Sequence, residues 1–300
     1  MKRTFVLGNG ESRKGLDLNN LKEYGTIYGC NALYRDFTPD GLIAVDWAIM
    51  HEIYASGYAQ NNPCYFRQWN KIPAEMYFFM MKTDIATKPQ DYLNEKLREK
   101  GWPTVDHFVK ETERTDEQEF VLHGIHFDRL VDRMEYILTH FSDLSPEEVK
   151  WKLGNAGLWV SWIKDNDCAY DIDDHLGQEV SGSSAGPVAV NIACHNEQPD
   201  ECFLVGFDMY SNTDTVNNMY KDTNCYIAGD CRPIQPVNWI KDHRENFHKY
   251  TDTKFYRVMP NVLGTDKVSS FIEEWRDCDN IEYISIDEMK EILDFKTIAC

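Results

Sequence analysis

The sequence predicts an α/β fold in which a mostly parallel sheet is flanked by helices. Three short apolar runs open the chain, at residues 4–7, 26–28 and 42–45, and each ends at a glycine or a polar residue. Such runs are typical of parallel strands that are buried on both faces. Two later runs, at residues 202–205 and 254–259, repeat the pattern. Parallel sheets bind ligands at the carboxyl ends of their strands, so we expect a site at this edge.

Helical patterns follow the later strands. A helix of small residues is predicted at 185–194, and a second helix is predicted from Pro236 to about residue 250. Near the C-terminus, a strand at residues 282–284 precedes a helix that begins at Ser285. Glu288 stands three residues later, which is the spacing of a capping box.

The middle of the chain has a different pattern. Apolar residues recur there at the spacing of an amphipathic helix, at Phe127, Leu130, Val131, Met134, Ile137 and Leu138. Ser145, followed by Pro146 and Glu148, marks a second helix start. We therefore expect one α/β domain over residues 1–300, with a helical insertion at residues 85–165 and a mobile, lid-like loop at residues 211–235.

Composition excludes several classes of protein. The chain has 31 Lys and Arg against 50 Asp and Glu, a net charge of −19, which argues against duplex nucleic acid and anionic membranes as partners. No apolar run reaches the ~18 residues of a membrane span. Nine cysteines without a C-x-x-C pair indicate reduced thiols and a cytoplasmic protein. The sequence leaves a homo-oligomer open.

The sharpest local motif is the turn after the first strand, which contains Gly8, Asn9, Gly10 and Ser12. We expect its glycines to adopt positive φ values and to let a ligand reach peptide N–H groups. The turn is not the dinucleotide fingerprint, because Arg13 occupies the place of the third glycine. Nor is it a Walker loop, since no Gly-Lys-Ser/Thr follows. Alone, such a turn is more often only a turn.

A serine motif offers a different chemistry. Residues 182–186 match the G-x-S-x-G pattern of a hydrolase nucleophile elbow, and Asp208 and His243 follow in the hydrolase order. An elbow requires an apolar strand directly before it, whereas residues 173–179 are mostly polar. The start of a small-residue helix is therefore the favoured interpretation.

Two clusters have the spacing of metal ligands. The acidic run at residues 171–175 resembles the D-x-D motif that holds divalent cations, but a solvated loop is favoured on so acidic a chain. His123 and His126 have no third ligand nearby, so a loop is favoured there too. We predict no metal and no cofactor.

Five motifs in the order of strands carry a resemblance to a known family. They are residues 5–12, residues 29–34, Val180-Ser181-Gly182, residues 204–210 and residues 225–230. In these, the chain resembles the bacterial sialyltransferases that use a CMP-activated sugar donor. It also resembles the related Rossmann-like group that includes archaeal hydroxymethylpterin pyrophosphokinases and motility-factor glycosyltransferases. The resemblance covers about the first 46 residues and about residues 179–262.

The resemblance implies roles for individual residues. The glycine turn (Gly8, Asn9, Gly10 and Ser12) would face the phosphate and ribose of a nucleotide sugar. The remaining residues implied on the nucleotide are Asn31, Asp46, Ser181 and Gly182.

Two tyrosines, Tyr210 and Tyr226, would hydrogen-bond the departing phosphate, and Tyr220 is a looser match to a third. Neutral tyrosine donors can stabilise the leaving oxygen without a metal. The implied activity is a metal-independent transfer from a nucleotide sugar to a glycan or small-molecule acceptor.

One departure from the family concerns the general base. The sialyltransferases carry a histidine just after the tyrosine, whereas this chain has Asp230 at the nearest position. Carboxylate bases are common in glycosyl transfer, so Asp230 is the candidate base. Two alternatives stay open: a Mg²⁺-dependent pyrophosphate or phosphate transferase on the same scaffold, and a non-catalytic nucleotide binder.

Overall fold

The computed structural model describes a large part of the chain. The described residues are 1–67, 70–72, 122–123, 158–160, 162–163, 167–177 and 184–294. The chain divides into two compact units. The first comprises Met1–Ile49, Asn62–Tyr65 and Ile172–Cys300, and the second comprises Met50–Asn61 and Phe66–Asp171.

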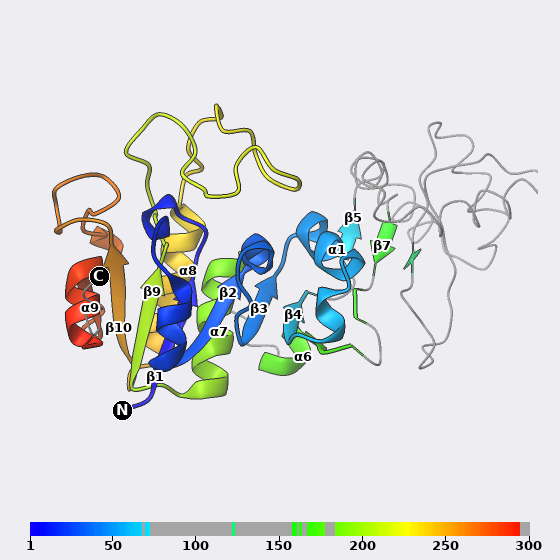
Figure 1. The fold of residues 1–300 in the computed structure, drawn as a ribbon, viewed down its shortest axis with the longest axis horizontal. Helices are drawn as coiled ribbons and strands as arrows, with labels where there is room; N and C mark the ends of the chain where they lie inside the picture. Colours follow the sequence, from blue (N-terminus) through cyan, green and yellow to red (C-terminus); the bar gives the residue numbers. More distant parts are fainter. Residues whose placement is uncertain are drawn as a thin grey trace, which may run out of the picture. The chain divides into compact units, whose positions relative to one another are not determined.

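The fold is organised around an eight-stranded sheet of order β11-β10-β9-β1-β2-β3-β4-β8. Its strands are β1 (Arg3–Leu7), β2 (Thr26–Cys30), β3 (Gly41–Ala44), β4 (Cys64–Phe66), β8 (Ala169–Asp171), β9 (Glu201–Val205), β10 (Lys254–Met259) and β11 (Ile281–Ser285). The pairs from β11 to β3 are parallel. β1 lies between β2 and β9, so segments far apart in the sequence meet beside it (Figure 1).

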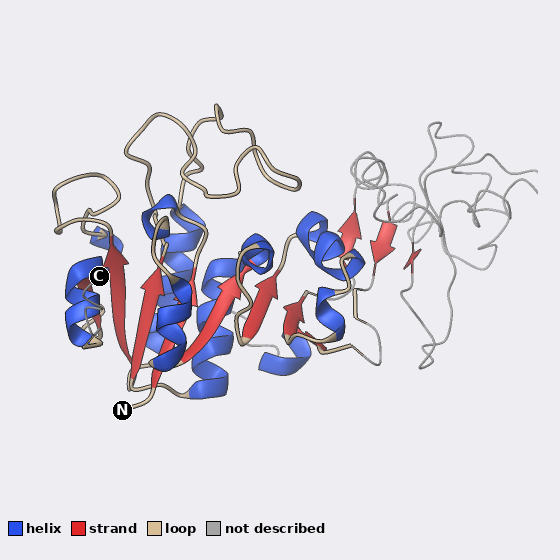
Figure 2. Ribbon diagram, in the orientation of Figure 1, coloured by secondary structure: helices blue, strands red, loops and turns tan. Residues whose placement is uncertain are grey.

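Burial explains why the central strands are continuously apolar. Phe5 of β1 stacks on Phe203 of β9 with ring centroids 5.1 Å apart, and Phe203 stacks on Tyr256 of β10 at 4.7 Å. Almost every residue of β1, β9 and β10 is buried, and helices lie beside the sheet (Figure 2). The predicted α/β fold with a parallel sheet is confirmed.

Helix α7 (Ala185–Glu197) packs against β1, β2 and β3, and α8 (Val237–Lys249) packs on α7. The small side chains of α7 are buried, which allows this close approach. The other α-helices are α1 (Trp47–Ala55), α6 (Ile172–Leu176) and α9 (Ile286–Ile292). Short 3₁₀ helices occur at η1 (Glu11–Arg13), η2 (Leu18–Glu23), η3 (Asn31–Arg35), η4 (Tyr58–Gln60) and η5 (Glu273–Trp275).

Several predicted elements can be compared directly. The five predicted strands, the two helices after Gly182 and Pro236, and the C-terminal strand are all present within a few residues. Ser285 and Glu288 form the predicted capping box at the start of α9. The predicted acidic loop at 171–175 is wrong, because Ile172 and Leu176 are buried and residues 172–176 form α6.

The second unit contains a three-stranded antiparallel sheet of order β5-β7-β6. Its strands are β5 (Asn70–Ile72), β6 (Leu122–His123) and β7 (Leu158–Val160). His123 therefore belongs to a strand and not to the predicted loop. The predicted helices at 127–138 and from residue 145 lie outside the described residues.

The segment from 206 to 236 connects β9 to α8 and contains no helix or strand. Residues 211–235, the lid segment, are tied to the loops after β1 and β2. Met219 donates its N–H to the carbonyl of Asn9 at 2.9 Å, and the Arg35 guanidinium donates to Thr223 Oγ1 at 2.8 Å. That this segment acts as a mobile lid stays a prediction.

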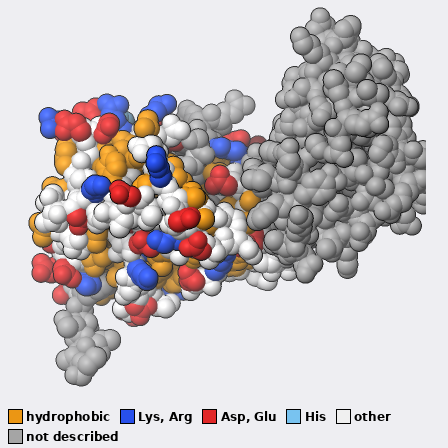
Figure 3. Space-filling view, turned by 90° about the horizontal axis from the view of Figure 1, so that it is seen from above, with side chains coloured by type: hydrophobic (Ala, Val, Ile, Leu, Met, Phe, Trp, Pro, Cys, Tyr) orange, Lys and Arg blue, Asp and Glu red, His pale blue; other side chains and the backbone are white. Residues whose placement is uncertain are grey.

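The surface is charged without a large basic patch on the face that Figure 3 shows. Acidic and basic side chains alternate there among hydrophobic ones. Within the described part of the chain, no helix has the length and apolar character needed to cross a bilayer.

Candidate functional site

A cavity of about 340 Å³ opens at the carboxyl ends of the central strands in the first unit. Its lining residues come from the ends of β1, β2, β3 and β9 and the loops that follow them, from the first turn of α7, from the lid segment and from α8. They are Gly8, Asn9, Gly10, Cys30, Asn31, Asp46, Ser184, Ala185, Gly186, Pro187, Gly206, Phe207, Asp208, Met209, Asn217, Asn218, Ile234, Trp239 and His243. A second cavity of about 280 Å³ shares Asn31, Asp208 and Trp239 with the first and adds Tyr210 and Tyr226.

Asn9 and Tyr226 meet directly across these loops. The Asn9 side-chain amide donates to the Tyr226 hydroxyl at 3.0 Å, and the backbone N–H of Ala32 donates to the same oxygen at 3.3 Å. Burial raises the pKa of Tyr226, so the phenol is neutral at physiological pH and keeps its own proton to donate. Tyr226 is thus a pre-positioned hydrogen-bond donor beside Asn9.

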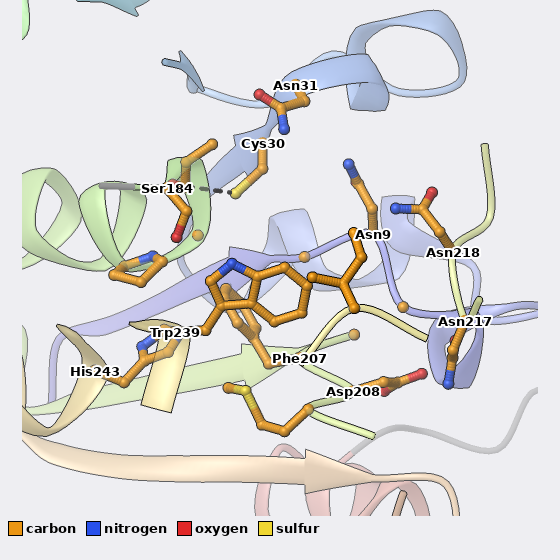
Figure 4. Close-up of a pocket in the computed structure, with 18 of the residues that line it drawn as sticks. Asn9, Cys30, Asn31, Ser184, Phe207, Asp208, Asn217, Asn218, Trp239 and His243 are labelled. Atoms are coloured by element: carbon orange, nitrogen blue, oxygen red, sulfur yellow. Dashed lines mark hydrogen bonds between the residues drawn. The ribbon is translucent and has the colours of Figure 1, made fainter. Parts of the chain in front are cut away.

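The two asparagines have unused hydrogen-bonding capacity. The Oδ1 atoms of Asn9 and Asn31 are both buried, and neither has a hydrogen-bond partner among the described residues. Asn31 adopts a positive φ of 52°, a conformation that asparagine tolerates better than most residues. An unpaired buried carbonyl costs about 1–3 kcal/mol, which a ligand donor would offset. Figure 4 shows Asn9 and Asn31 among the residues that line the cavity.

Tyr210 lies on the second cavity and is partly buried. Its backbone carbonyl accepts a hydrogen bond from Asn217 Nδ2 at 3.2 Å. Burial, and then the negative charge of Glu274, raise the pKa of its phenol. Tyr220 is different: it is buried and bonded to Arg13, and it lines neither cavity.

The glycine turn does not adopt the predicted conformation, in which positive φ values would expose peptide N–H groups to a ligand. The N–H groups of Gly8 and Gly10 donate to the carbonyls of Val205 and Gly206, each at 2.8 Å. Neither Gly8 nor Gly10 has a positive φ. A Cβ on Gly8 would lie 2.5 Å from the Gly206 carbonyl oxygen, so glycine is needed here for close packing of two loops.

Ser12 supports Asp208 and does not line either cavity. Its backbone N–H donates to Asp208 Oδ2 at 2.8 Å, and its hydroxyl donates to Oδ1. Burial raises the pKa of Asp208, although the Ser12 bonds, Asn217 and the charge of Arg257 oppose that shift. Ser12 therefore orients a lining carboxylate and lies one layer behind the cavity.

Arg13 is a buried brace between the glycine turn and the lid segment. It is 3% exposed, and its Nε donates to the carbonyl of Gly8 at 2.7 Å while Nη2 donates to the Tyr220 hydroxyl at 3.0 Å. Because both bonds are internal, Arg13 holds the lid segment and does not face the cavity.

The other predicted site residues have different fates. Asp46 is exposed and lines both cavities. Ser181 and Gly182 lie outside the described residues. Asp230, the candidate base, is exposed and is not among the residues that line either cavity. The structure therefore brings together Gly8, Asn9, Gly10, Asn31, Asp46, Tyr210 and Tyr226, and it leaves Asp230 and Ser12 off the cavity surface.

One geometric observation favours the hydrolase alternative, and two others contradict it. Ser184, Asp208 and His243 all line the same cavity. However, Ser184 Oγ and both His243 nitrogens have no hydrogen-bond partner in the described structure, so no relay connects them. Ser184 also has relaxed extended angles, φ −127° and ψ 152°, instead of the strained turn of an elbow.

One group of side chains has the composition of a metal site. His248, Asp277 and Cys278 bring ligand atoms within 4.8 Å of one another. Arg244 donates to both carboxylate oxygens of Asp277 and holds the pKa of that carboxyl at about 2. None of these residues lines either cavity. We interpret the group as an ion-pair cluster on α8 and the segment after η5.

Several lining residues escaped the sequence analysis. Phe207 and Trp239 supply two aromatic rings, and Asn217 and Asn218 supply two further amides. Phe207 was within a quoted motif, at the residue before Asp208. Nothing in the sequence marks Trp239 or Asn218, because their position depends on how α8 and the lid segment fold back.

No family model matches the chain, and no curated protein matches it. Among solved structures, the chain is similar to the sialyltransferase CstII from Campylobacter jejuni in complex with a substrate analogue, cytidine-5′-monophosphate. That similarity has a TM-score of 0.37 and 12% identity, over 87% of this chain and 81% of that one.

A second similar structure is the sialyltransferase CST-II in complex with a trisaccharide acceptor and CMP. The TM-score is 0.34 and the identity 13%, over 98% of this chain and 99% of that one.

Proposed function

We propose that this chain is a glycosyltransferase that takes a sugar from a nucleotide-activated donor and passes it to a hydroxyl group of an acceptor. One observation carries the proposal: two asparagines, Asn9 and Asn31, have buried side-chain oxygens without a partner among the described residues, and Tyr226 lies beside Asn9, at two cavities that share lining residues at the carboxyl edge of a parallel sheet. The sequence motifs quoted above favour a CMP-linked sugar as the donor and a glycan or small molecule as the acceptor.

The electrostatics of the cavities favour neutral donors for the phosphate. Within the described residues, the lining sets contain no lysine or arginine. The Arg35 guanidinium lies beside Tyr226, with its Cζ 5.8 Å from the ring centroid of that residue. The positive charge of Arg35 lowers the pKa of Tyr226, although burial outweighs it. Arg35 therefore favours negative charge beside the phenol without contacting the phosphate.

The proposed reaction breaks the bond between the anomeric carbon and the phosphate oxygen, and that oxygen keeps the electron pair. Tyr226 and Tyr210 stabilise the resulting anion by donating hydrogen bonds, a contribution that typically reaches 10²–10³ in rate per donor. The acceptor oxygen bonds to the anomeric carbon and its proton passes to a base. Asp230 is the proposed base on its sequence position after Tyr226, and no metal takes part.

A thermal-shift screen tests the binding part of this proposal. With EDTA present, CMP should raise the melting temperature of the wild type, and Asn31→Ala should remove that rise. Asn238→Ala, an exposed asparagine on α8, is the matched control and should keep it. If neither cytidine nor uridine nucleotides shift the melting temperature, this function is refuted.

A non-catalytic nucleotide binder is the second candidate, and one observation favours it. Asp230 is exposed and lines neither cavity, and Asp208 is already engaged by Ser12. Calorimetric binding of CMP without turnover of any donor would support a binder, whereas release of CMP from a donor would support the transferase.

The Mg²⁺-dependent alternative requires the acidic residues of α6, so full activity of Asp173→Ala would count against it.

A further inference from the structure

His243 is the most unusual side chain on the cavity. It is 1% exposed, and neither Nδ1 nor Nε2 has a hydrogen-bond partner among the described residues. Burying an imidazole with both nitrogens unpaired costs free energy, and no hydrogen bond from the described residues offsets that cost. A group of this kind on a cavity wall indicates a partner that arrives with the ligand.

The ring is held firmly in one place. Its neighbours are aromatic: Phe207 meets it edge-on at 5.0 Å, Trp275 at 5.9 Å, and Phe247 stacks on it at 6.1 Å between centroids. Asn246, on the next turn of α8, donates to the carbonyl of Pro187 at 2.8 Å and so ties α8 to the first turn of α7. His243 is therefore a fixed part of the cavity wall.

The first turn of α7 approaches His243 and Phe207 closely at Gly186. A Cβ built on Gly186 would lie 3.9 Å from His243 Nε2 and 3.0 Å from the Phe207 ring. Gly186 itself lines the cavity, so Nε2 faces the turn that borders the open space. Any side chain at Gly186 would narrow this space.

Ser184 adds a second unsatisfied group at the same turn. It is the N-cap residue of α7, yet its hydroxyl makes no cap bond and is buried without a partner in the described structure. An N-cap serine usually bonds the N–H of the second or third helical residue, and the third residue here is Pro187, which has no N–H. The hydroxyl therefore has unused hydrogen-bonding capacity at the cavity wall.

This end of the cavity is bordered by flat aromatic rings and by neutral polar groups. Burial, and then the charge of Arg257, lower the pKa of His243 to about 3, so the imidazole is neutral at physiological pH. It offers one donor and one acceptor, and it is too weak a base for catalysis. In Figure 4, His243 and Ser184 lie on one side of the Trp239 indole. Asn9 and Asn217 lie on the other side. Trp239 and His243 are four residues apart on α8 and share a face.

We infer that His243 determines specificity by hydrogen-bonding the polar edge of the nucleobase, which lies among Ser184, Phe207 and Trp239. This inference rests on the proposed function and assigns the inner end of the cavity. A planar heteroaromatic ring with donors and acceptors on its edge matches two aromatic walls, a neutral imidazole and a hydroxyl. A sugar phosphate without a base has nothing to offer His243.

Calorimetry with CMP and ribose 5-phosphate, in EDTA, tests the inference. Removing one hydrogen bond to the base should weaken CMP binding about 5- to 30-fold in His243→Leu. Ribose 5-phosphate, which lacks the base, should bind this variant within twofold of the wild type. His243→Gln retains a polar atom near the place of Nε2 and should recover most of the CMP affinity. His248→Leu, an exposed histidine on the same helix, is the matched control.

Gly186→Ala provides an independent variant if His243→Leu does not fold. Its methyl group would partly cover Nε2, so CMP binding should fall while ribose 5-phosphate binding stays. Equal CMP affinity in His243→Leu and the wild type would overturn the inference, as would equal losses for both ligands. If the wild type binds neither ligand, the proposed function itself fails, which is a distinguishable result.

Discussion

Acid should destabilise this protein through His243, and the effect can be worked from the structure. The unfolded histidine has a pKa near 6.5, whereas burial lowers the pKa of the folded residue to about 3. Below pH 6.5 the unfolded chain therefore binds a proton that the folded chain does not. The protonation of His243 therefore leaves the folding stability unchanged above pH 6.5 and lowers it as the pH falls toward 3.

The magnitude at pH 5 follows from the unfolded pKa alone, because the folded pKa lies well below 5. Protonation 1.5 units below the unfolded pKa stabilises the unfolded state by about 2 kcal/mol. Urea unfolding at pH 8 and pH 5 should therefore show that the wild type loses about 2 kcal/mol more than His243→Leu does. His51, whose pKa burial lowers to about 4, contributes to both proteins and cancels in the difference.

His248→Leu removes an exposed histidine of the same helix, so it should show the same pH dependence as the wild type. If His243→Leu and the wild type lose equal stability between pH 8 and pH 5, His243 accepts a proton in the folded state. The assignment of a buried imidazole that stays neutral in the folded protein would then be refuted.

Three further predictions concern the loops and a helix end, each measured by urea unfolding. Gly10→Ala would place Cβ 2.7 Å from the carbonyl oxygen of Gly206, so we expect a loss of about 1–3 kcal/mol, and an unchanged midpoint would contradict the packing role. Arg13→Met removes the donors to Gly8 and Tyr220 and should also lower the free energy of unfolding by about 1–3 kcal/mol. An unchanged free energy of unfolding would show that these two hydrogen bonds are dispensable. Ser285→Ala breaks the capping box of α9 and should lower the free energy of unfolding by about 1 kcal/mol. It should leave CMP binding unchanged, so a change in CMP affinity would contradict this prediction.

Much of the fold could be predicted because its signals are local. An apolar run that stops at a glycine or a polar residue marks a buried strand, and β1 and β10 lie close to where their runs predict them. The capping box at Ser285 is likewise a contact within four residues. Strand order is different: β9 lies beside β1 although almost 200 residues separate them, and no local pattern encodes that pairing.

The site could be predicted only in part, for a related reason. Asn31 directly follows β2 and Asn9 stands two residues after β1, so their place at the sheet edge follows from the strands themselves. The roles of Gly8 and Ser12 differ from expectation because the turn packs against residues 206–208, a contact between distant segments. The sequence marks His243 only by its order after Asp208, because its burial and its two unpaired nitrogens depend on how α8 packs on α7.

The most direct test of the whole account is a structure of this chain with CMP bound in the presence of EDTA. The account predicts the phosphate within hydrogen-bond distance of the Tyr226 hydroxyl, with donors of the nucleotide facing the Oδ1 atoms of Asn9 and Asn31. CMP bound elsewhere, or cavities that stay empty at saturating CMP, would contradict it.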